Sequence, residues 1–161
     1  MLDQQQFRQL MGRFATGVTV VTLAGENGAP YGLTVNAFTS VSLDPMLVLI
    51  CIDKKVGGYE LFKPGRGFAV NILAEDQEEI SNRFATRDAD RFARLTYRTG
   101  VTGAPILDGV LAYLECRITR AYDGGDHTIF LGEVKAGQIE EHKSPLLFFG
   151  GRYGHLATTE R

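Results

Sequence analysis

The residues best suited to hold a ligand lie between positions 32 and 42, where hydroxyl and amide side chains interrupt an apolar sequence. Thr34, Asn36, Thr39, Ser40 and Ser42 are spread along this segment. Short side-chain donors and backbone N–H groups at a crossing between two strands can bind a planar heteroaromatic ring and a phosphate. A Thr- and Ser-rich strand without a ligand fits the same residues, because β-propensity alone favours them there.

Positive charge follows a strongly apolar run at Lys54 and Lys55. A lysine at the end of a strand can meet a phosphate, although a charged pair in a turn is often only solvated. Ser81, Arg83 and Phe84 end a predicted helix and could cover a ligand. Phe84 has an equally good explanation as a core residue of that helix.

His127 has the sharpest context of the three histidines. It follows Gly124, Gly125 and Asp126 at the start of a predicted strand, which suits a side chain that faces a ligand. A histidine in a turn is otherwise an ordinary surface residue. The remaining histidines lack the spacing of metal ligands, so we predict no metal site. Tyr153, in a Gly-rich turn near the C-terminus, belongs either to a lid or to an ordinary turn.

Composition limits the kinds of protein that can present these residues. The 161 residues are 44% hydrophobic and 22% charged with a net charge of -2, which predicts one globular domain spanning 1–161 and no general affinity for nucleic acid. Cys51 and Cys116 lie in apolar runs without CxxC spacing and are predicted to be reduced core residues. We see no secretion signal, and the longest apolar run, 46–52, is too short for a membrane span, so we expect a cytoplasmic protein without a membrane partner.

The pattern of apolar residues predicts mostly short β-strands. A helix is expected over 3–14, with Asp3 as N-cap, and a second over 76–84, whereas 59–62 forms a short helix and 86–109 holds little regular structure. The run 46–52 is expected to be a strand buried on both faces. Strands are predicted at 18–23, 31–35, 38–43, 46–52, 68–73, from 110 onward and at 128–136, with a hairpin turn at Asn27-Gly28.

Six or seven sequential antiparallel strands with Gly-rich turns predict a closed or nearly closed small β-barrel with a few short helices. No GxGxxG follows a strand, so a nicotinamide cofactor would not be held in a Rossmann manner. Walker, HExxH and GxSxG motifs are also missing from the sequence.

The order of several segments resembles the short-chain flavin reductases, the reductase components of two-component flavin-dependent monooxygenases. These segments are Phe14-Ala15-Thr16-Gly17-Val18-Thr19-Val20-Val21-Thr22, the run from Thr34 to Ser42, Ala69-Val70-Asn71-Ile72-Leu73, Gly125-Asp126-His127 and Phe148-Phe149-Gly150-Gly151-Arg152-Tyr153. The resemblance implies a homodimeric, antiparallel Greek-key FMN-binding split barrel. It also implies that NADH or NADPH reduces FMN or FAD, which then diffuses to a monooxygenase partner.

Carried over by position, the resemblance implies a catalytic role for His127 at the nicotinamide. It also implies a flavin site in which one of the two lysines meets the phosphate and in which Ser81 and Phe84 close the site. The residues implied for this flavin site are Thr34, Val35, Asn36, Ala37, Ser40, Ser42, Cys51, Lys54, Lys55, Ser81, Phe84 and Tyr153. A non-enzymatic flavin-binding protein, a pyridoxamine-phosphate-oxidase-like enzyme and a haem-handling barrel are alternatives on the same fold.

Overall fold

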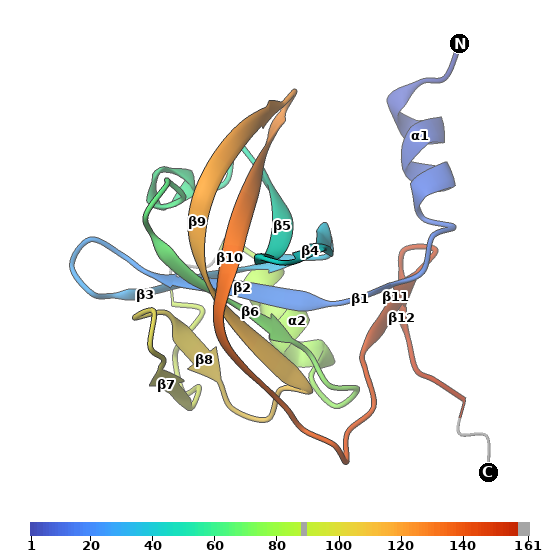
Figure 1. The fold of residues 1–161 in the computed structure, drawn as a ribbon. Helices are drawn as coiled ribbons and strands as arrows, with labels where there is room; N and C mark the ends of the chain where they lie inside the picture. The colour runs from blue at the N-terminus through green and yellow to red at the C-terminus, as the bar shows by residue number, and fades with distance from the viewer. Residues whose placement is uncertain (88–89, 158–161) are drawn as a thin grey trace.

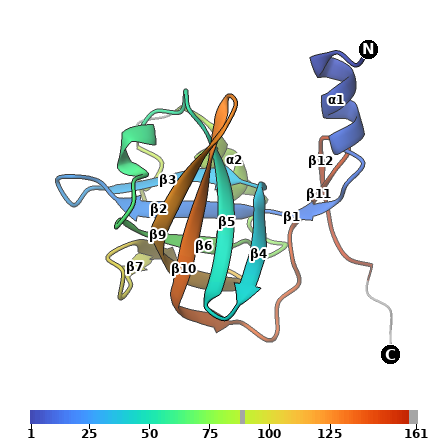
Figure 2. The same ribbon diagram turned by 45° about the horizontal axis from the view of Figure 1, so that its top comes forward.

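The computed structural model describes residues 1–87 and 90–157, and its main feature is one curved antiparallel sheet (Figures 1 and 2). Its seven strands run in the order β3-β2-β6-β9-β10-β5-β4. They are β2 (Thr19–Ala24), β3 (Pro30–Val35), β4 (Phe38–Leu43), β5 (Met46–Asp53), β6 (Gly67–Ile72), β9 (Ala112–Gly124) and β10 (His127–Ile139). The predicted antiparallel barrel is therefore confirmed.

The two edges of this sheet belong to strands that are consecutive in the chain. β3 ends at Val35 and β4 begins at Phe38, so only Asn36 and Ala37 join opposite edges. The sheet must curl for so short a link to connect its edges. The barrel consequently closes at Asn36 and Ala37 without a ladder between β3 and β4, and this seam is where the site lies.

Apolar side chains fill two cores on either side of β2, every residue of which is buried except Ala24. Inside the barrel, Val21, Ile50 and Phe130 belong to one cluster. On the outside, Val20 packs in a second cluster with Phe84, from α2 (Glu78–Ala85). The helix thus covers the outer face of β2 and β3.

The predicted excursion over 86–109 contains one short hairpin, formed by β7 (Tyr97–Thr99) and β8 (Pro105–Leu107). The rest consists of turns, in line with the prediction, although positions 88 and 89 lie outside the described residues. The short helix predicted at 59–62 is the 3-10 helix η1 (Tyr59–Leu61). The hairpin predicted at Asn27-Gly28 joins β2 to β3, with Gly28 at a φ of 73°.

The N-terminal helix α1 (Gln4–Met11) stands away from the barrel (Figure 1). Asp3 caps it through a capping box with Gln6, as expected for a helix start, but the helix ends before Phe14. None of its residues is buried. It is joined to the barrel through a small sheet of β1 (Thr16–Gly17), β11 (Leu147–Phe149) and β12 (Arg152–Gly154).

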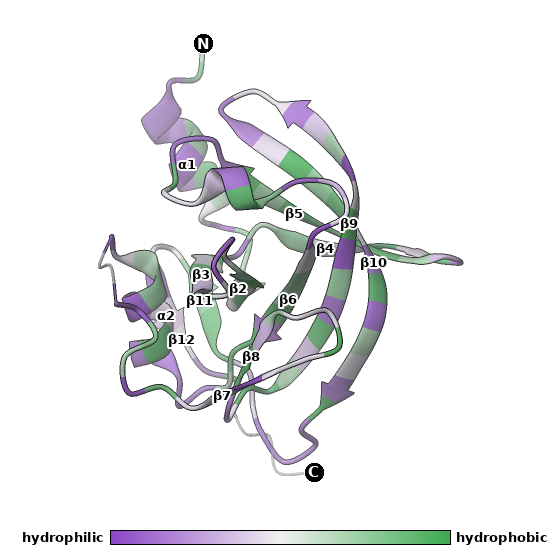
Figure 3. Ribbon diagram, turned by 90° about the vertical axis from the view of Figure 1, so that its left-hand side faces the viewer, coloured by the Kyte–Doolittle hydropathy of each residue, from purple (hydrophilic) through white to green (hydrophobic). Residues whose placement is uncertain are grey.

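The prediction that the run 46–52 is buried on both faces is wrong. Burial alternates along β5: Val48, Ile50 and Ile52 face the core, whereas Met46 is 57% exposed and Cys51 is partly exposed. Cys51 is therefore not the core residue that we expected. Bands of hydrophilic and hydrophobic residues alternate in the same way along β9 and β10 (Figure 3). Both faces of β5 are apolar, but only one of them is buried. The other face remains open and forms part of the site.

Among the described residues, no helix combines the length and the hydropathy needed to cross a membrane.

Candidate functional site

Three adjoining cavities at the seam of the barrel make one elongated groove. The first, the apolar section, has a volume of about 700 Å³ and is walled by the end of α1, by β1 and by the open face of β5. Phe14, Phe38, Leu49 and Ile72 line it together with the link residue Asn36. Apolar walls with a few polar groups at one edge are typical of sites for planar organic ligands.

The middle section is smaller, about 170 Å³, and contains His127. It shares Asn36, Ala37 and Cys51 with the apolar section, so the two cavities meet at the link between β3 and β4. Thr34 also lines the middle section, and its hydroxyl donates to the Ser81 carbonyl at 2.6 Å, which ties β3 to α2. The link and His127 therefore face the same space.

The third cavity, the cationic section, has a volume of about 540 Å³ and continues from Thr34. Among the described residues, Lys55, Arg87 and Arg91 line it, opposed by a single carboxylate, that of Asp53. Three positive charges against one negative charge favour an anionic ligand group. Phosphate is such a group.

Arg91 is the best held of these cations. One guanidinium nitrogen donates to the Gly32 carbonyl at 2.6 Å, and the group lies over the Tyr31 ring at 5.9 Å from its centre. Burial raises the pKa of Tyr31, and the charge of Arg91 opposes that rise. The Nε of Arg91 is buried and has no partner among residues 1–87 and 90–157, and neither has Oγ1 of Thr16 in the apolar section. A buried polar atom without a partner costs free energy, which a bound ligand would relieve.

His127 is held by its neighbour in sequence. Its Nδ1 lies 2.7 Å from Oδ1 of Asp126, and its side chain is 41% exposed. The hydrogen bond with the imidazole lowers the pKa of Asp126. Because Nδ1 is engaged, Nε2 is the ring nitrogen that remains for a ligand.

The groove brings together eight of the thirteen site residues that the resemblance implies. They are Thr34, Val35, Asn36, Ala37, Cys51, Lys55, Phe84 and His127. Phe84 is 1% exposed, with its ring close against Gly32, so it belongs to the core as well as to the wall. Val35 also borders the middle section, although its side chain is buried in the barrel.

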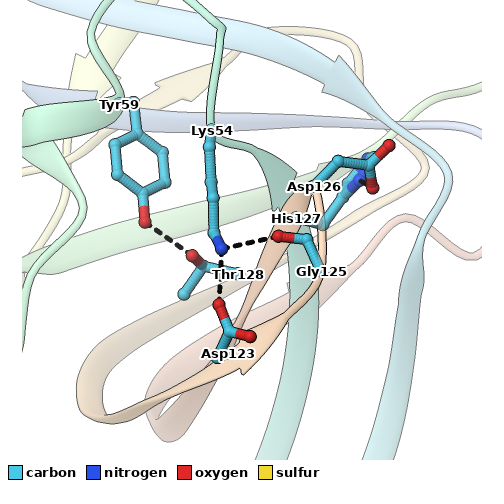
Figure 4. A network of polar contacts seen from close by, with 7 residues as sticks. All are labelled: Lys54, Tyr59, Asp123, Gly125, Asp126, His127 and Thr128. Atoms are coloured by element: carbon cyan, nitrogen blue, oxygen red, sulfur yellow. Dashed lines mark hydrogen bonds and ion pairs between the residues drawn. The ribbon is translucent and has the colours of Figure 1, made fainter.

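Five selected residues do not line these three cavities. Ser40 and Ser42 lie on the edge strand β4. Ser81 is fully buried, and its hydroxyl lies 2.7 Å from the Tyr153 hydroxyl, which in turn donates to Asn82 at 3.0 Å. Lys54 points to the β9–β10 turn (Figure 4). A direct contact of these five with flavin stays a prediction.

Several lining residues escaped the sequence analysis. Arg87 and Arg91 lie in the segment with little regular structure, and Thr16 precedes the first long strand. The cluster of arginines over 87–98 was a signal, but charge alone does not say which of them turns toward a groove. Within the described part of the chain, no cluster of His, Cys, Asp and Glu could hold a metal ion.

Comparison with known proteins identifies the family of this chain. The model of the flavin reductase-like domain matches residues 11–157. The chain belongs to this family. The resemblance inferred from the sequence is thus confirmed.

Relatives within the flavin reductase-like family include enzymes with a named activity. The NADH-dependent FAD reductase of Streptomyces globisporus is 43% identical over 160 residues, covering 96% of this chain and 87% of that protein. The reductase component of 4-nitrophenol 4-monooxygenase/4-nitrocatechol 2-monooxygenase of Rhodococcus opacus is 42% identical, covering 96% of this chain and 82% of that protein.

Solved structures agree with the family assignment. The NADH:FAD oxidoreductase of Streptomyces globisporus C-1027 has a TM-score of 0.92 at 42% identity, over 99% of this chain and 98% of that chain. The styrene monooxygenase flavin reductase of Pseudomonas putida S12 has a TM-score of 0.86 at 35% identity, over 96% and 99%. The fold of this chain is accordingly that of flavin reductases.

Proposed function

We propose that this protein is an oxidoreductase that uses NADH to reduce a flavin and supplies the reduced flavin to a partner flavin-dependent monooxygenase. The observation that carries the proposal is the groove, in which an apolar section, a central histidine and a cationic section follow one another. This order matches a flavin nucleotide, which has an apolar ring system, a polyol chain and a phosphate end. The names and structures of the relatives support the same activity.

The flavin ring lies in the apolar section beside the link between β3 and β4. Thr16 supplies the buried hydroxyl that has no partner within the described part of the chain, and Asn36 supplies an amide at the ring edge. Backbone N–H groups near the link stabilise negative charge on the reduced ring. The open face of β5, with Cys51 and Leu49, forms the floor.

The phosphate end lies in the cationic section, where Lys55, Arg87 and Arg91 supply the charge. Of the two lysines after β5, Lys55 takes the role that the sequence analysis gave to the pair, because Lys54 is paired elsewhere. Both FMN and FAD carry a phosphate at this position. Riboflavin carries none.

His127 contacts the nicotinamide and leaves flavin binding largely to the rest of the groove. When bound, the two cofactors supply the hydride chemistry themselves. The chain positions the rings against each other and excludes water, and no side chain has to act as a nucleophile. An imidazole fixed by Asp126 at 2.7 Å is well suited to positioning, because its ring orientation is set before the ligand arrives.

The protein works as a homodimer. Phe7, Leu10, Met11 and Phe14 are all more than half exposed on one face of the N-terminal arm, a pattern that favours contact with a second copy. Since Met11 and Phe14 also line the apolar section, the second copy would complete the wall around the flavin ring.

The chain, over 1–161, forms one domain and is cytoplasmic. The family model spans 11–157, which leaves little of the chain outside it. Both cysteines are free thiols, and free thiols fit a reducing compartment.

The decisive experiment measures NADH and NADPH oxidation against FMN, FAD and riboflavin, with wild type and His127→Ala compared. We expect NADH consumption that depends on added flavin. His127→Ala should slow flavin reduction or raise the KM for NADH by about 10- to 100-fold, as for loss of one hydrogen bond at the reacting centre, with the flavin Kd within a few-fold of wild type. Flavin binding without NADH consumption would identify a flavin-binding protein and refute the proposed enzyme.

A matched test addresses the cationic section. We expect wild type to bind FMN more tightly than riboflavin, and Arg91→Met to reduce that preference by about tenfold, the usual effect of losing a charge-assisted hydrogen bond. An unchanged preference would place the phosphate elsewhere.

A further inference from the structure

On one side, the hairpin that carries His127 extends beyond the support of the barrel. β9 exchanges its last backbone hydrogen bonds with the barrel at Ile118, which bonds to Gly65 and Arg66, and its remaining residues pair with β10 alone. β10, in contrast, stays paired with β5 up to its first residue, His127, opposite Asp53. The turn contains Gly125 at a φ of 80°, with open space around it. The end of β9 and the glycine turn are therefore the least supported part of the hairpin unless something fixes them.

Lys54 fixes that end at three points, and Figure 4 shows the two that its ammonium group makes. Its backbone N–H donates to the Asp126 carbonyl at 3.0 Å. Its ammonium group donates to the Gly125 carbonyl at 2.6 Å and to the Asp123 carboxylate at 2.5 Å. One residue at the end of β5 thus binds three residues of the turn.

These contacts continue to His127 through Asp126. The carbonyl of Asp126 is bound by Lys54, and the carboxylate of the same residue binds the imidazole. Behind the turn, the Thr128 hydroxyl lies 2.5 Å from the Tyr59 hydroxyl, so a second contact holds the same strand from the segment that follows Lys54 (Figure 4). The place of the imidazole in the middle section depends on both.

We propose that Lys54 is a positioning residue for NADH oxidation, acting through the β9–β10 turn on His127 and contacting neither ligand. This inference rests on the proposed role of His127 at the nicotinamide. Lys54 does not line the groove, whereas its neighbour Lys55 does. The pair with Asp123 is exposed, 37% and 79% for the two side chains, and such pairs add little to global stability. We therefore expect the bonds of Lys54 to affect the position of the turn and of His127 and not the stability of the whole protein.

The geometric effect is large enough to measure. A misplacement of a reacting group by about 1 Å can cost about 100-fold in rate, so a turn that loses two of its three bonds is expected to cost about tenfold. Two variants test this effect: Lys54→Met, which removes both hydrogen bonds of the ammonium group, and Asp123→Asn, which removes the charge of its partner. Lys54→Arg can still reach both acceptors and should recover most of the loss.

The test measures three quantities on the full-length protein: flavin Kd by fluorescence, NADH dependence of flavin reduction by anaerobic stopped flow, and the imidazole resonances of His127 by NMR. The chain has three histidines, so assignment is practical. We expect Lys54→Met to raise the half-saturating NADH concentration or to slow reduction by about tenfold. Asp123→Asn, which weakens only one of the three bonds, should act in the same direction and by less. Both should shift or broaden the His127 resonances and leave flavin Kd unchanged. Lys55→Met, the matched control, should weaken flavin binding instead.

Because the two variants remove charges of opposite sign, comparing them tests for a simple electrostatic effect on the binding of the anionic NADH. Removing a positive charge at Lys54 would weaken NADH binding, and removing a negative charge at Asp123 would strengthen it. Effects in the same direction therefore support positioning, and effects of opposite sign would overturn it. A weaker flavin Kd for Lys54→Met would also overturn it, in favour of a phosphate contact.

A double variant separates this inference from the proposed function. If Lys54 acts through His127, Lys54→Met should have no further effect on reduction in the His127→Ala background. Additive losses would refute positioning while leaving the role of His127 intact. If His127→Ala alone has no effect on NADH handling, the proposed role of His127 fails, and the inference fails with it.

Discussion

A single charge on the N-terminal helix should dissociate the proposed homodimer without unfolding the protein. The substitution is Leu10→Glu. Leu10 is 56% exposed in the single chain, between Phe7 at 57% and Phe14 at 71%, so about half of each side chain remains to be covered by a second copy. No residue of α1 is buried against the barrel, and the change therefore leaves the core untouched.

The expected magnitude follows from that exposed half. Full burial of a leucine stabilises by about 1.5 to 3 kcal/mol, so covering the remaining half contributes about 1 kcal/mol for each copy. Two copies lose about 2 kcal/mol, and a carboxylate placed in an apolar contact adds a desolvation cost of a few kcal/mol more. Since about 1.4 kcal/mol corresponds to a tenfold change, the dimer dissociation constant should rise by at least about 100-fold.

Sedimentation or light scattering across a concentration series measures this constant. Gln9→Glu is the matched control: it adds the same charge on the same helix, away from the Phe7, Leu10, Met11 and Phe14 face. The control should remain a dimer. Wild type that runs at 17.7 kDa, or Leu10→Glu that dimerises like wild type, would refute the reasoning. An intact β-sheet spectrum for Leu10→Glu shows that only association was lost.

Three further outcomes are expected. Asn36→Ala should raise the flavin Kd by about 10- to 100-fold, the cost of one lost polar partner at the ring edge, and an unchanged titration by fluorescence would remove the residue from the site. A thiol reagent should label Cys51 before Cys116, because Cys51 lines the groove whereas burial, aided by the charge of Glu115, raises the pKa of Cys116 to about 12. Bound flavin should slow the labelling of Cys51. Equal labelling of the two cysteines by mass spectrometry would contradict this. Hydrogen bonding to the partner lowers the pKa of Asp123 and raises the pKa of Lys54, so both groups stay charged across the neutral range. The pair is lost only as pH falls through the lowered pKa of the carboxyl or rises through the raised pKa of the ammonium group. The ratio of the NADH half-saturation of Lys54→Met to that of wild type should therefore be constant between about pH 6 and about pH 9, and a ratio that changes tenfold in this range would argue against the pair.

The buried carboxylate of Glu115 shows where alternation along a strand stops being informative. The pattern places Glu115 on the opposite face of β9 from Cys116, which is where the structure has it. The turn between β7 and β8 covers that face, and its Thr102 donates from both backbone and hydroxyl to the carboxylate, leaving Glu115 2% exposed. Period-two alternation assigns a face, but only the fold decides what lies over it.

The same distinction applies to the two lysines after β5. The sequence identifies two adjacent cations at the end of an apolar strand and gives no way to choose between them. In the structure, adjacent residues diverge: Lys54 meets the turn between β9 and β10, some seventy positions away in the chain, and Lys55 meets the groove. The sequence cannot assign the two lysines to the groove and to the turn, because the partners of Lys54 lie far from it in the chain and both residues are of the same type.

By itself, the sequence determined the strand-rich fold, the position of the hairpins and the family, because these depend on local periodicity, turn residues and the order of short motifs. It also selected Asn36, Ala37 and His127, which all reach the groove. Only the tertiary structure decided that the seam of the barrel joins them to the arginines of a segment with little regular structure. That junction arises because a two-residue link connects opposite edges of the sheet, and the closure of a sheet is a property of all its strands together.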